Sequence, residues 1–272
     1  MILTWCMLQY QRGAPCTIGP AEGRLMMFPI PEGCGPLLRV QVVVAHPDDE
    51  TFGCGSLLLH AARAGACTAV VCATRGEAGE VAPGIEVPDG GLGELREAEL
   101  RAAAGLLGVR RVDLLGFRDS GMDGELSPDT LVGADVLEVR AAVEAVVEEF
   151  EPHVLVTLDG SDGHRDHARM RDVTLAVAKA HGLPVYLHCL PRSTMRRWAD
   201  HMATINPELS YLRLGELGTP DEEVSVVLDS SELYDLRWEA IRAHRSQSSP
   251  FDGLPDDLAR EFLARDHLVA VR

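Results

Sequence analysis

Two short stretches of this chain combine imidazole and carboxylate side chains at close spacing. Residues 46–50 read HPDDE, and residues 164–167 read HRDH. Two imidazoles and one carboxylate are a known ligand set for catalytic zinc, which keeps a coordination position open for water. A bound metal lowers the pKa of that water and can polarise a substrate carbonyl. We therefore expect His46, Asp49 and His167 to hold a metal ion.

The neighbouring side chains supply the other groups that amide hydrolysis needs. Asp48 stands next to Asp49 and is the candidate general base. His164 is the candidate for stabilising the oxyanion and protonating the leaving amine, provided that Asp166 or another carboxylate keeps it protonated. Together these groups predict a hydrolase that transfers an acyl group from an amine to water.

Each stretch also has a simpler interpretation. Aspartate and glutamate favour helix N-termini, so HPDDE alone could be an acid-rich helix start and HRDH a solvated one. A motif match by itself has a high false-positive rate. The metal-site hypothesis is favoured because both stretches follow predicted strands of one sheet.

The hydrophobic pattern predicts alternating strands and helices up to residue 190. Apolar runs predict strands at residues 38–45, 68–74, 112–115, 153–158 and 184–190, and helical spacing predicts helices at 51–64, 94–107, 131–150 and 165–181. Beyond residue 191 we expect strands at 224–228 and 267–271 and a helix at 231–244. This is typical of an α/β fold with a mostly parallel sheet, helices on both faces and a C-terminal elaboration. Ligands bind beyond the carboxyl ends of such strands, where both stretches lie.

Composition restricts the classes of partner. The net charge of −17 argues against a nucleic-acid binder, which needs clustered Lys and Arg, and Lys179 is the only lysine. No apolar run reaches the length of about 20 residues that spans a bilayer, so we expect no membrane insertion. The seven cysteines form no CxxC pair, which favours reduced thiols in a cytoplasmic protein.

The domain organisation is predicted to be simple. Residues 1–35 have no clear period and are either an N-terminal extension or the result of a start codon assigned upstream of Met26 or Met27. Residues 36–272 are expected to form a single domain. Glycines in the stretch 53–55 (GCG) are expected to let the first helix pack closely on the sheet. The sequence leaves the oligomeric state open, a homo-oligomer included.

The same motifs resemble those of a known family. AHPDDE, TRGEAGE after the second strand and GHRDH resemble the LmbE-like deacetylases, also called the PIG-L or GlcNAc-phosphatidylinositol de-N-acetylase family. Three further stretches support the resemblance, which covers roughly residues 38–250: REAE at 96–99, GFRDSGM at 116–122 and AHRSQ at 243–247.

The resemblance implies a Rossmann-like fold and the roles given above for the metal ligands, the base and His164. It also implies that Arg96, Asp119 and Asp166 lie near the sugar or support the site. Zinc is the implied cofactor, although ferrous iron accepts the same ligand set. Known members remove N-acetyl groups from small molecules or glycoconjugates that contain glucosamine.

Three features depart from the family or bear on the substrate. Arg165 stands where relatives usually have proline; its guanidinium could bind an anionic substrate group or face solvent, and we favour solvent. Asp162 stands where some thiol-pathway enzymes carry tyrosine. The acidic loop at residues 76–91 suits a neutral or cationic substrate better than a polyanion.

The leading hypothesis is therefore N-deacetylation of an amino-sugar compound. One alternative is an amidase that acts on a sugar–thiol conjugate, or a deacylase of a glycosylated natural product. An alternative of a different class is a non-catalytic module that binds metal or sugar. That alternative is disfavoured because all five site residues are present.

Overall fold

Seven strands of the chain form one sheet in the order β3-β2-β1-β4-β5-β7-β6. A computed structural model describes residues 38–208, 212 and 215–271, so the predicted extension at 1–35 lies outside the described residues. The strands are β1 (Arg39–Val44), β2 (Cys67–Cys72), β3 (Arg111–Leu114), β4 (Val154–Leu158), β5 (Val185–Cys189), β6 (Val226–Asp229) and β7 (Arg265–Val271). Strands β1 to β5 pair in parallel, whereas β7 pairs antiparallel with both β5 and β6.

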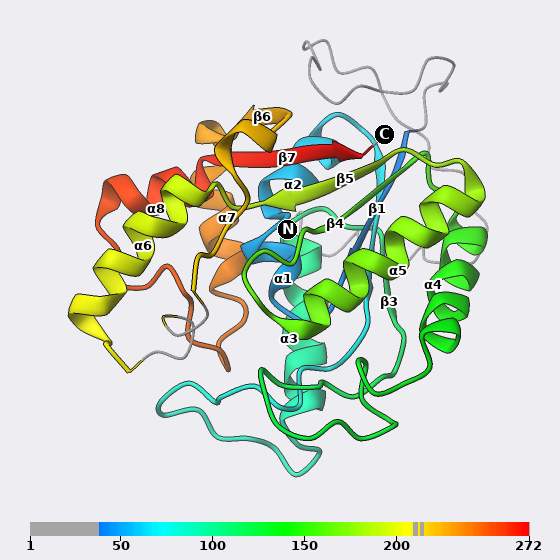
Figure 1. The fold of residues 1–272 in the computed structure, drawn as a ribbon, viewed down its shortest axis with the longest axis horizontal. Helices are drawn as coiled ribbons and strands as arrows, with labels where there is room; N and C mark the ends of the chain where they lie inside the picture. The colour runs from blue at the N-terminus through cyan, green and yellow to red at the C-terminus, as the bar shows by residue number, and fades with distance from the viewer. Residues whose placement is uncertain (1–37, 209–211, 213–214, 272) are drawn as a thin grey trace, which may run out of the picture.

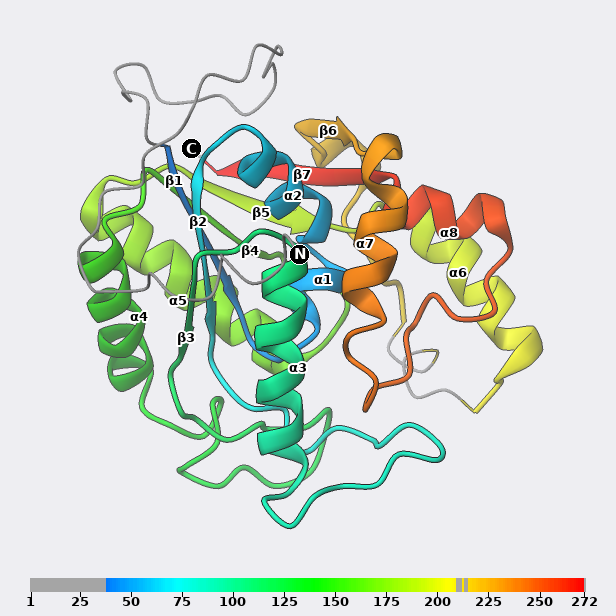
Figure 2. The ribbon, with the colours of Figure 1, turned by 180° about the vertical axis from the view of Figure 1, so that it is seen from behind.

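Helices cover both faces of this sheet (Figures 1 and 2). They are α1 (Asp49–Phe52), α2 (Gly55–Arg63), α3 (Leu92–Leu106), α4 (Val136–Phe150), α5 (Arg165–His181), α6 (Arg192–Ile205), α7 (Tyr234–Ile241) and α8 (Asp256–Leu263). Helices α4 and α5 pack on one face, and α2, α3 and α7 cover the other. The predicted α/β class, with a mostly parallel sheet and a C-terminal elaboration, is confirmed.

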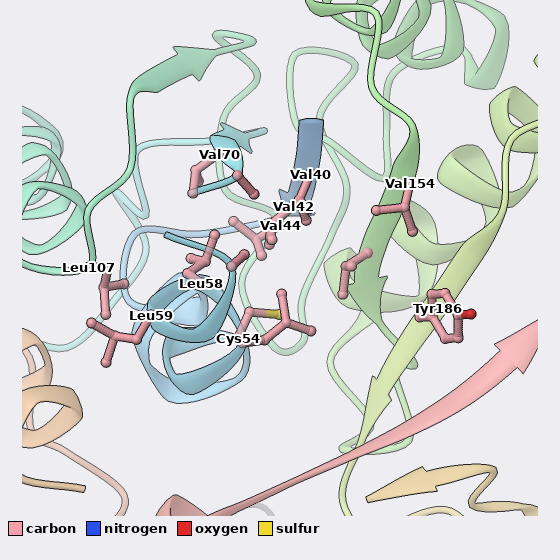
Figure 3. Packing of buried hydrophobic residues seen from close by; sticks show 14 of the residues in the cluster. Val40, Val42, Val44, Cys54, Leu58, Leu59, Val70, Leu107, Val154 and Tyr186 are labelled. Atoms are coloured by element: carbon pink, nitrogen blue, oxygen red, sulfur yellow. The ribbon is translucent and has the colours of Figure 1, made fainter. Parts of the chain in front are cut away.

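Strand β1 is the middle one of the five parallel strands, and apart from Gln41 its buried side chains are apolar. Val40, Val42 and Val44 pack with Leu58 of α2 on one side of the sheet (Figure 3). Val43 points to the other side and joins the cluster formed by α4 and α5. Successive side chains of a strand alternate between faces, so a continuous apolar run is required where both faces are covered.

Two helix predictions need correction. The helix predicted at 51–64 is two helices, because the chain breaks at Gly53 and Cys54 between α1 and α2. The helix predicted at 131–150 begins at Val136, where Asp135 caps it by accepting a hydrogen bond from the Leu137 backbone N–H. Propensity alone does not place such a start, since the cap decides it. Helices α6 and α8 were not predicted.

The missed helices form part of a third apolar cluster with α7. Their buried members include Met195 and Trp198 of α6 and Phe262 of α8. In the described part of the chain, no helix is long and apolar enough to cross a membrane. The elaboration beyond β5 is therefore a packed layer, joined to the sheet through β7.

The direction in which the sheet is built reverses between β1 and β4. From β1 the chain moves outward through β2 and β3, and then returns to the other side of β1 as β4. Ligands of open α/β sheets bind at such a reversal, beyond the carboxyl ends of the strands. The two histidine-containing stretches follow β1 and β4, so the topology brings them together.

Candidate active site

Three buried histidines meet beyond the ends of β1 and β4. His46 follows β1, His164 is the N-cap of α5, and His167 lies in the first turn of α5. Their ring centroids are 4.6 to 5.3 Å apart. One ligand nitrogen of each lies within 4.8 Å of the other two, a spacing at which one metal ion could be held.

Asp49 joins this cluster from the first position of α1. Its Oδ2 accepts hydrogen bonds from the backbone N–H groups of Ala45 (3.1 Å) and His46 (2.8 Å), which fix the carboxylate. The same oxygen lies 3.6 Å from His46 Nδ1, and Oδ1 lies 3.1 Å from His167 Nε2. The three predicted metal ligands therefore converge.

The ring of His167 carries an unused ligand atom. Its Nε2 is buried and makes no hydrogen bond, although Asp49 is close to it. Burial disfavours the charged imidazolium, but Asp162 and Asp49 outweigh this and raise the pKa of His167 well above its usual value. A buried polar atom that makes no hydrogen bond is costly, and a bound metal ion would satisfy this nitrogen.

The surroundings of His46 also favour positive charge. Its Nε2 lies 3.0 Å from Asp166 Oδ2 and 3.4 Å from Asp119 Oδ1. Burial acts to lower the pKa of His46, but the hydrogen bonds to Asp119 and Asp166 outweigh it and raise the pKa to about 10. The imidazoles of His46 and His167 thus both favour the protonated form, and carboxylates surround them. A divalent cation brings the same charge and would displace those protons, so these residues fit a metal ion.

Asp48 is held in an uncommon backbone conformation at the N-cap of α1. Its φ and ψ are 110° and −31°, a region that side-chain-bearing residues rarely adopt. Its backbone N–H donates to Glu50 Oε2 at 2.9 Å, and its Oδ2 accepts from the Arg96 guanidinium at 3.0 Å. Backbone strain of this kind persists where surrounding contacts impose it, commonly at functional sites.

The pKa of Asp48 suits a general base. Burial raises it, the Arg96 guanidinium opposes the rise, and the charge of Asp49 adds to it, so that the pKa reaches about 6. Arg96 is itself fixed by donating to the carbonyl oxygens of Gly76 (2.8 Å) and Pro47 (2.5 Å). Arg96 therefore lies beside the site and holds the carboxylate of Asp48 in place.

The expected protonation of His164 is wrong in this structure. The Asp166 carboxylate contacts His46, while only the Asp166 backbone N–H reaches His164, donating to its Nδ1 at 3.2 Å. Burial and the neighbouring imidazoles of His46 and His167 lower the pKa of His164 to about 4. His164 is therefore neutral, with Nδ1 as acceptor and its proton on Nε2.

The expectation that Arg165 faces solvent is also wrong. Its guanidinium donates to the backbone carbonyls of Gly121 (2.7 Å) and Gly124 (3.1 Å), and also to those of Ser120 and Asp123. These bonds tie the loop that follows Asp119 to the start of α5. A fold-dependent contact of this kind leaves no local signal in the sequence.

Sequence reasoning also missed two buried pairs behind the site. His244 Nε2 lies 2.6 Å from Glu50 Oε1, and both side chains are fully buried. Ser246 donates to Glu99 through both its backbone N–H (2.9 Å) and its hydroxyl (2.6 Å). The four residues belong to the HPDDE, REAE and AHRSQ stretches, so the sequence identified the motifs but not their pairing.

The predicted close packing at Gly53 is confirmed, since an added Cβ would lie 2.5 Å from a methyl group of Leu158 in β4.

Comparison with known proteins decides the family. The family model described as GlcNAc-PI de-N-acetylase (PIG-L) matches residues 41–178. The 1D-myo-inositol 2-acetamido-2-deoxy-alpha-D-glucopyranoside deacetylase of Rhodococcus jostii is 36% identical to the chain, and the match covers 86% of this chain and 91% of that protein. The chain belongs to the PIG-L family.

Solved structures show the same fold at lower identity. The N,N'-diacetylchitobiose deacetylase of Pyrococcus horikoshii superposes with a TM-score of 0.56 at 19% identity, covering 86% of this chain and 83% of that one. The 4-carboxy-2-hydroxymuconate hydratase GalB of Pseudomonas putida superposes with a TM-score of 0.55 at 17% identity, covering 86% and 96%. Because the fold also accommodates a hydratase, the reaction has to be argued from the residues of the site.

Membership in the PIG-L family confirms the predicted resemblance, and with it the class of enzyme, a deacetylase that hydrolyses a C–N bond. The match covers both histidine-containing stretches, including the three histidines with metal-ligand spacing.

Proposed function

We propose that the chain is a zinc-dependent hydrolase that removes the N-acetyl group from a small N-acetylglucosaminyl compound. The observation that carries this proposal is the convergence of His46, Asp49 and His167 with Asp48 at one edge of the sheet, in a chain of the PIG-L family. The substrate that gives the Rhodococcus relative its name, 1D-myo-inositol 2-acetamido-2-deoxy-alpha-D-glucopyranoside, is the first candidate. This compound is a neutral polyhydroxyl molecule. The acidic loop at residues 76–91 suits a neutral substrate better than a polyanion.

The two imidazoles and Asp49 would hold the zinc ion. When bound, zinc lowers the pKa of water and polarises the carbonyl of the scissile amide. Asp48, aligned by Arg96, takes the proton of the attacking water and then carries the proton that the leaving amine requires. His164 acts as a neutral donor, because its Nδ1 is occupied as an acceptor and its Nε2–H is left for the oxyanion.

Asp119 and Asp166 support this arrangement in different ways. Asp166 is fully buried, contacts His46 and also accepts from the Ser120 backbone N–H at 3.0 Å, so it orients the ring. Asp119 is also near His46, but it lies at the start of the loop that Arg165 holds, a place from which it can reach a sugar hydroxyl.

We also infer a cytoplasmic location, because the described part of the chain contains buried cysteines that form no disulfide.

The test is replacement of the base. Asp48→Ala should retain zinc and lose about 10²- to 10⁴-fold in kcat, the usual contribution of a positioned acid–base group. The matched control is Asp172→Ala, which removes an exposed carboxylate from α5 and should leave activity unchanged. Zinc content is measured by elemental analysis, and turnover by release of free amine.

A substrate panel tests which amine carries the acyl group. Acetylated glucosaminyl polyols are compared with sugar–thiol conjugates and with acylated glycosylated natural products, in the same amine-release assay. Higher kcat/KM for either of the latter would replace the proposed substrate class. Bound zinc without hydrolysis of any of them would favour a non-catalytic binding module.

A further inference from the structure

Asp162 contacts two parts of the candidate metal site with its two carboxylate oxygens. It lies in the turn between β4 and α5. Its Oδ2 is 2.5 Å from His167 Nδ1, and its Oδ1 accepts from the His164 backbone N–H at 3.0 Å. One oxygen is therefore used by the turn and the other by the ring.

The contact at Nδ1 has a consequence for the opposite side of the ring. A neutral imidazole carries its proton on one nitrogen and a lone pair on the other, and the partner of one nitrogen decides which. A carboxylate can only accept, so Asp162 keeps the proton on Nδ1 and leaves the lone pair on Nε2. That Nε2 is the buried atom without a hydrogen bond, beside Asp49.

We propose that Asp162 is a positioning residue of the metal site: its carboxylate fixes the tautomer and direction of the His167 ring so that Nε2 faces the metal. This inference rests on the proposed function, because it takes the cluster to be a metal site. Metal-ligating histidines commonly donate their other N–H to a carboxylate, and loss of that partner typically costs about 10- to 100-fold in metal affinity. Asp162 is fixed for this task by its second bond, to the backbone of the helix that carries the ring.

If Asp162 were purely structural, its only contact of importance would be the hydrogen bond that closes the turn. Asparagine keeps that contact, because its single side-chain oxygen can accept from the His164 backbone N–H. Asparagine cannot also accept from His167 Nδ1, since its amide NH₂ would then face that nitrogen. Two donors would oppose each other there, and the ring would move its proton to Nε2 or turn away. Asp162→Asn therefore separates the two roles.

The experiment measures zinc affinity by competition with a chromophoric chelator at constant pH. Asp162→Asn and Asp162→Ala are expected to bind zinc about 10- to 100-fold more weakly than the unmodified protein. The unfolding midpoint of the metal-free protein should decrease less in Asp162→Asn than in Asp162→Ala, because asparagine keeps the hydrogen bond to the His164 backbone N–H. The control is Asp135→Asn. Asp135 is the exposed N-cap of α4, and its side-chain oxygen also accepts from a backbone N–H. Asparagine and aspartate are similar caps, so zinc affinity and stability should be unchanged in this variant.

Activity supplies a separate readout. Deacetylation by Asp162→Asn should be weak at limiting zinc and recover at saturating zinc, whereas loss of the base at Asp48 is not recovered by metal. Zinc affinity of Asp162→Asn within twofold of the unmodified protein would overturn the positioning role, and so would an unmodified protein that does not bind zinc. If the unmodified protein binds zinc but releases no amine, the proposed function fails, while the affinity comparison still decides the role of Asp162.

Discussion

Arg237 is a fully buried cation that ties α7 to the helix carrying Asp49. Its guanidinium donates to the carbonyl oxygens of Thr51 (3.1 Å) and Gly53 (3.1 Å) at the C-terminal end of α1, and to Asp266 Oδ1 in β7 at 2.7 Å. Both charged side chains have zero exposure. The last carbonyls of a helix have no partner within it, so Arg237 satisfies groups that α1 leaves open.

Replacement of Arg237 by methionine should be strongly destabilising. The change leaves the Asp266 carboxylate buried and unpaired, and removal of one partner of a buried ion pair costs about 3–5 kcal/mol. In a domain of this size, 1 kcal/mol corresponds to a shift of about 2–4 °C in the unfolding midpoint, so we expect a decrease of roughly 6–20 °C. Burial opposes ionisation of Asp266, but Arg237 outweighs it and lowers the pKa of that carboxyl.

The loss of stability is measured by urea unfolding at pH 8, and the shift in midpoint temperature by thermal unfolding. Three proteins are compared: the unmodified protein, Arg237→Met and the double variant Arg237→Met/Asp266→Asn. The double variant should recover part of the loss, since it removes the unpaired charge. A single variant within about 1 kcal/mol of the unmodified protein would refute the reasoning, and so would a double variant less stable than the single one.

Three further outcomes follow from the structure. Burial raises the pKa of Asp48 to about 6, so kcat/KM should fall about tenfold per unit as pH decreases below that value; a flat pH–rate profile down to pH 5 would contradict its role as the base. Arg165→Pro removes charged hydrogen bonds to the loop at residues 120–124, and should cost about 1.5–3 kcal/mol and raise KM while zinc content stays constant; faster proteolysis within that loop is the second readout, and an unchanged KM would count against the contact. Gly53→Ala places a Cβ 2.5 Å from a leucine methyl of β4 and should destabilise by about 1–3 kcal/mol, whereas Gly105→Ala in α3 meets no atom within 4 Å and should stabilise slightly. Equal unfolding midpoints for the two alanine variants would contradict the packing argument.

The sequence by itself determined the α/β class and the place of the chemistry. Local periodicity is written into adjacent residues, so the apolar runs of β1, β2 and β4 and the amphipathic pattern of α5 were read directly. Parallel strands between helices then required the HPDDE and HRDH stretches to lie at one sheet edge. The candidate ligands could be named without coordinates, because two imidazoles and one carboxylate are a known ligand set for catalytic zinc.

Only the tertiary structure decided which side chains act on one another. The bonds from Arg165 to a loop, from Arg237 to α1 and from Asp162 to His167 depend on backbone positions and directions that no local pattern encodes. The neutral state of His164 has the same origin, since it depends on which part of Asp166 reaches the ring. Element types follow from short-range periodicity, whereas protonation and orientation follow from burial and from partners that the fold brings close together.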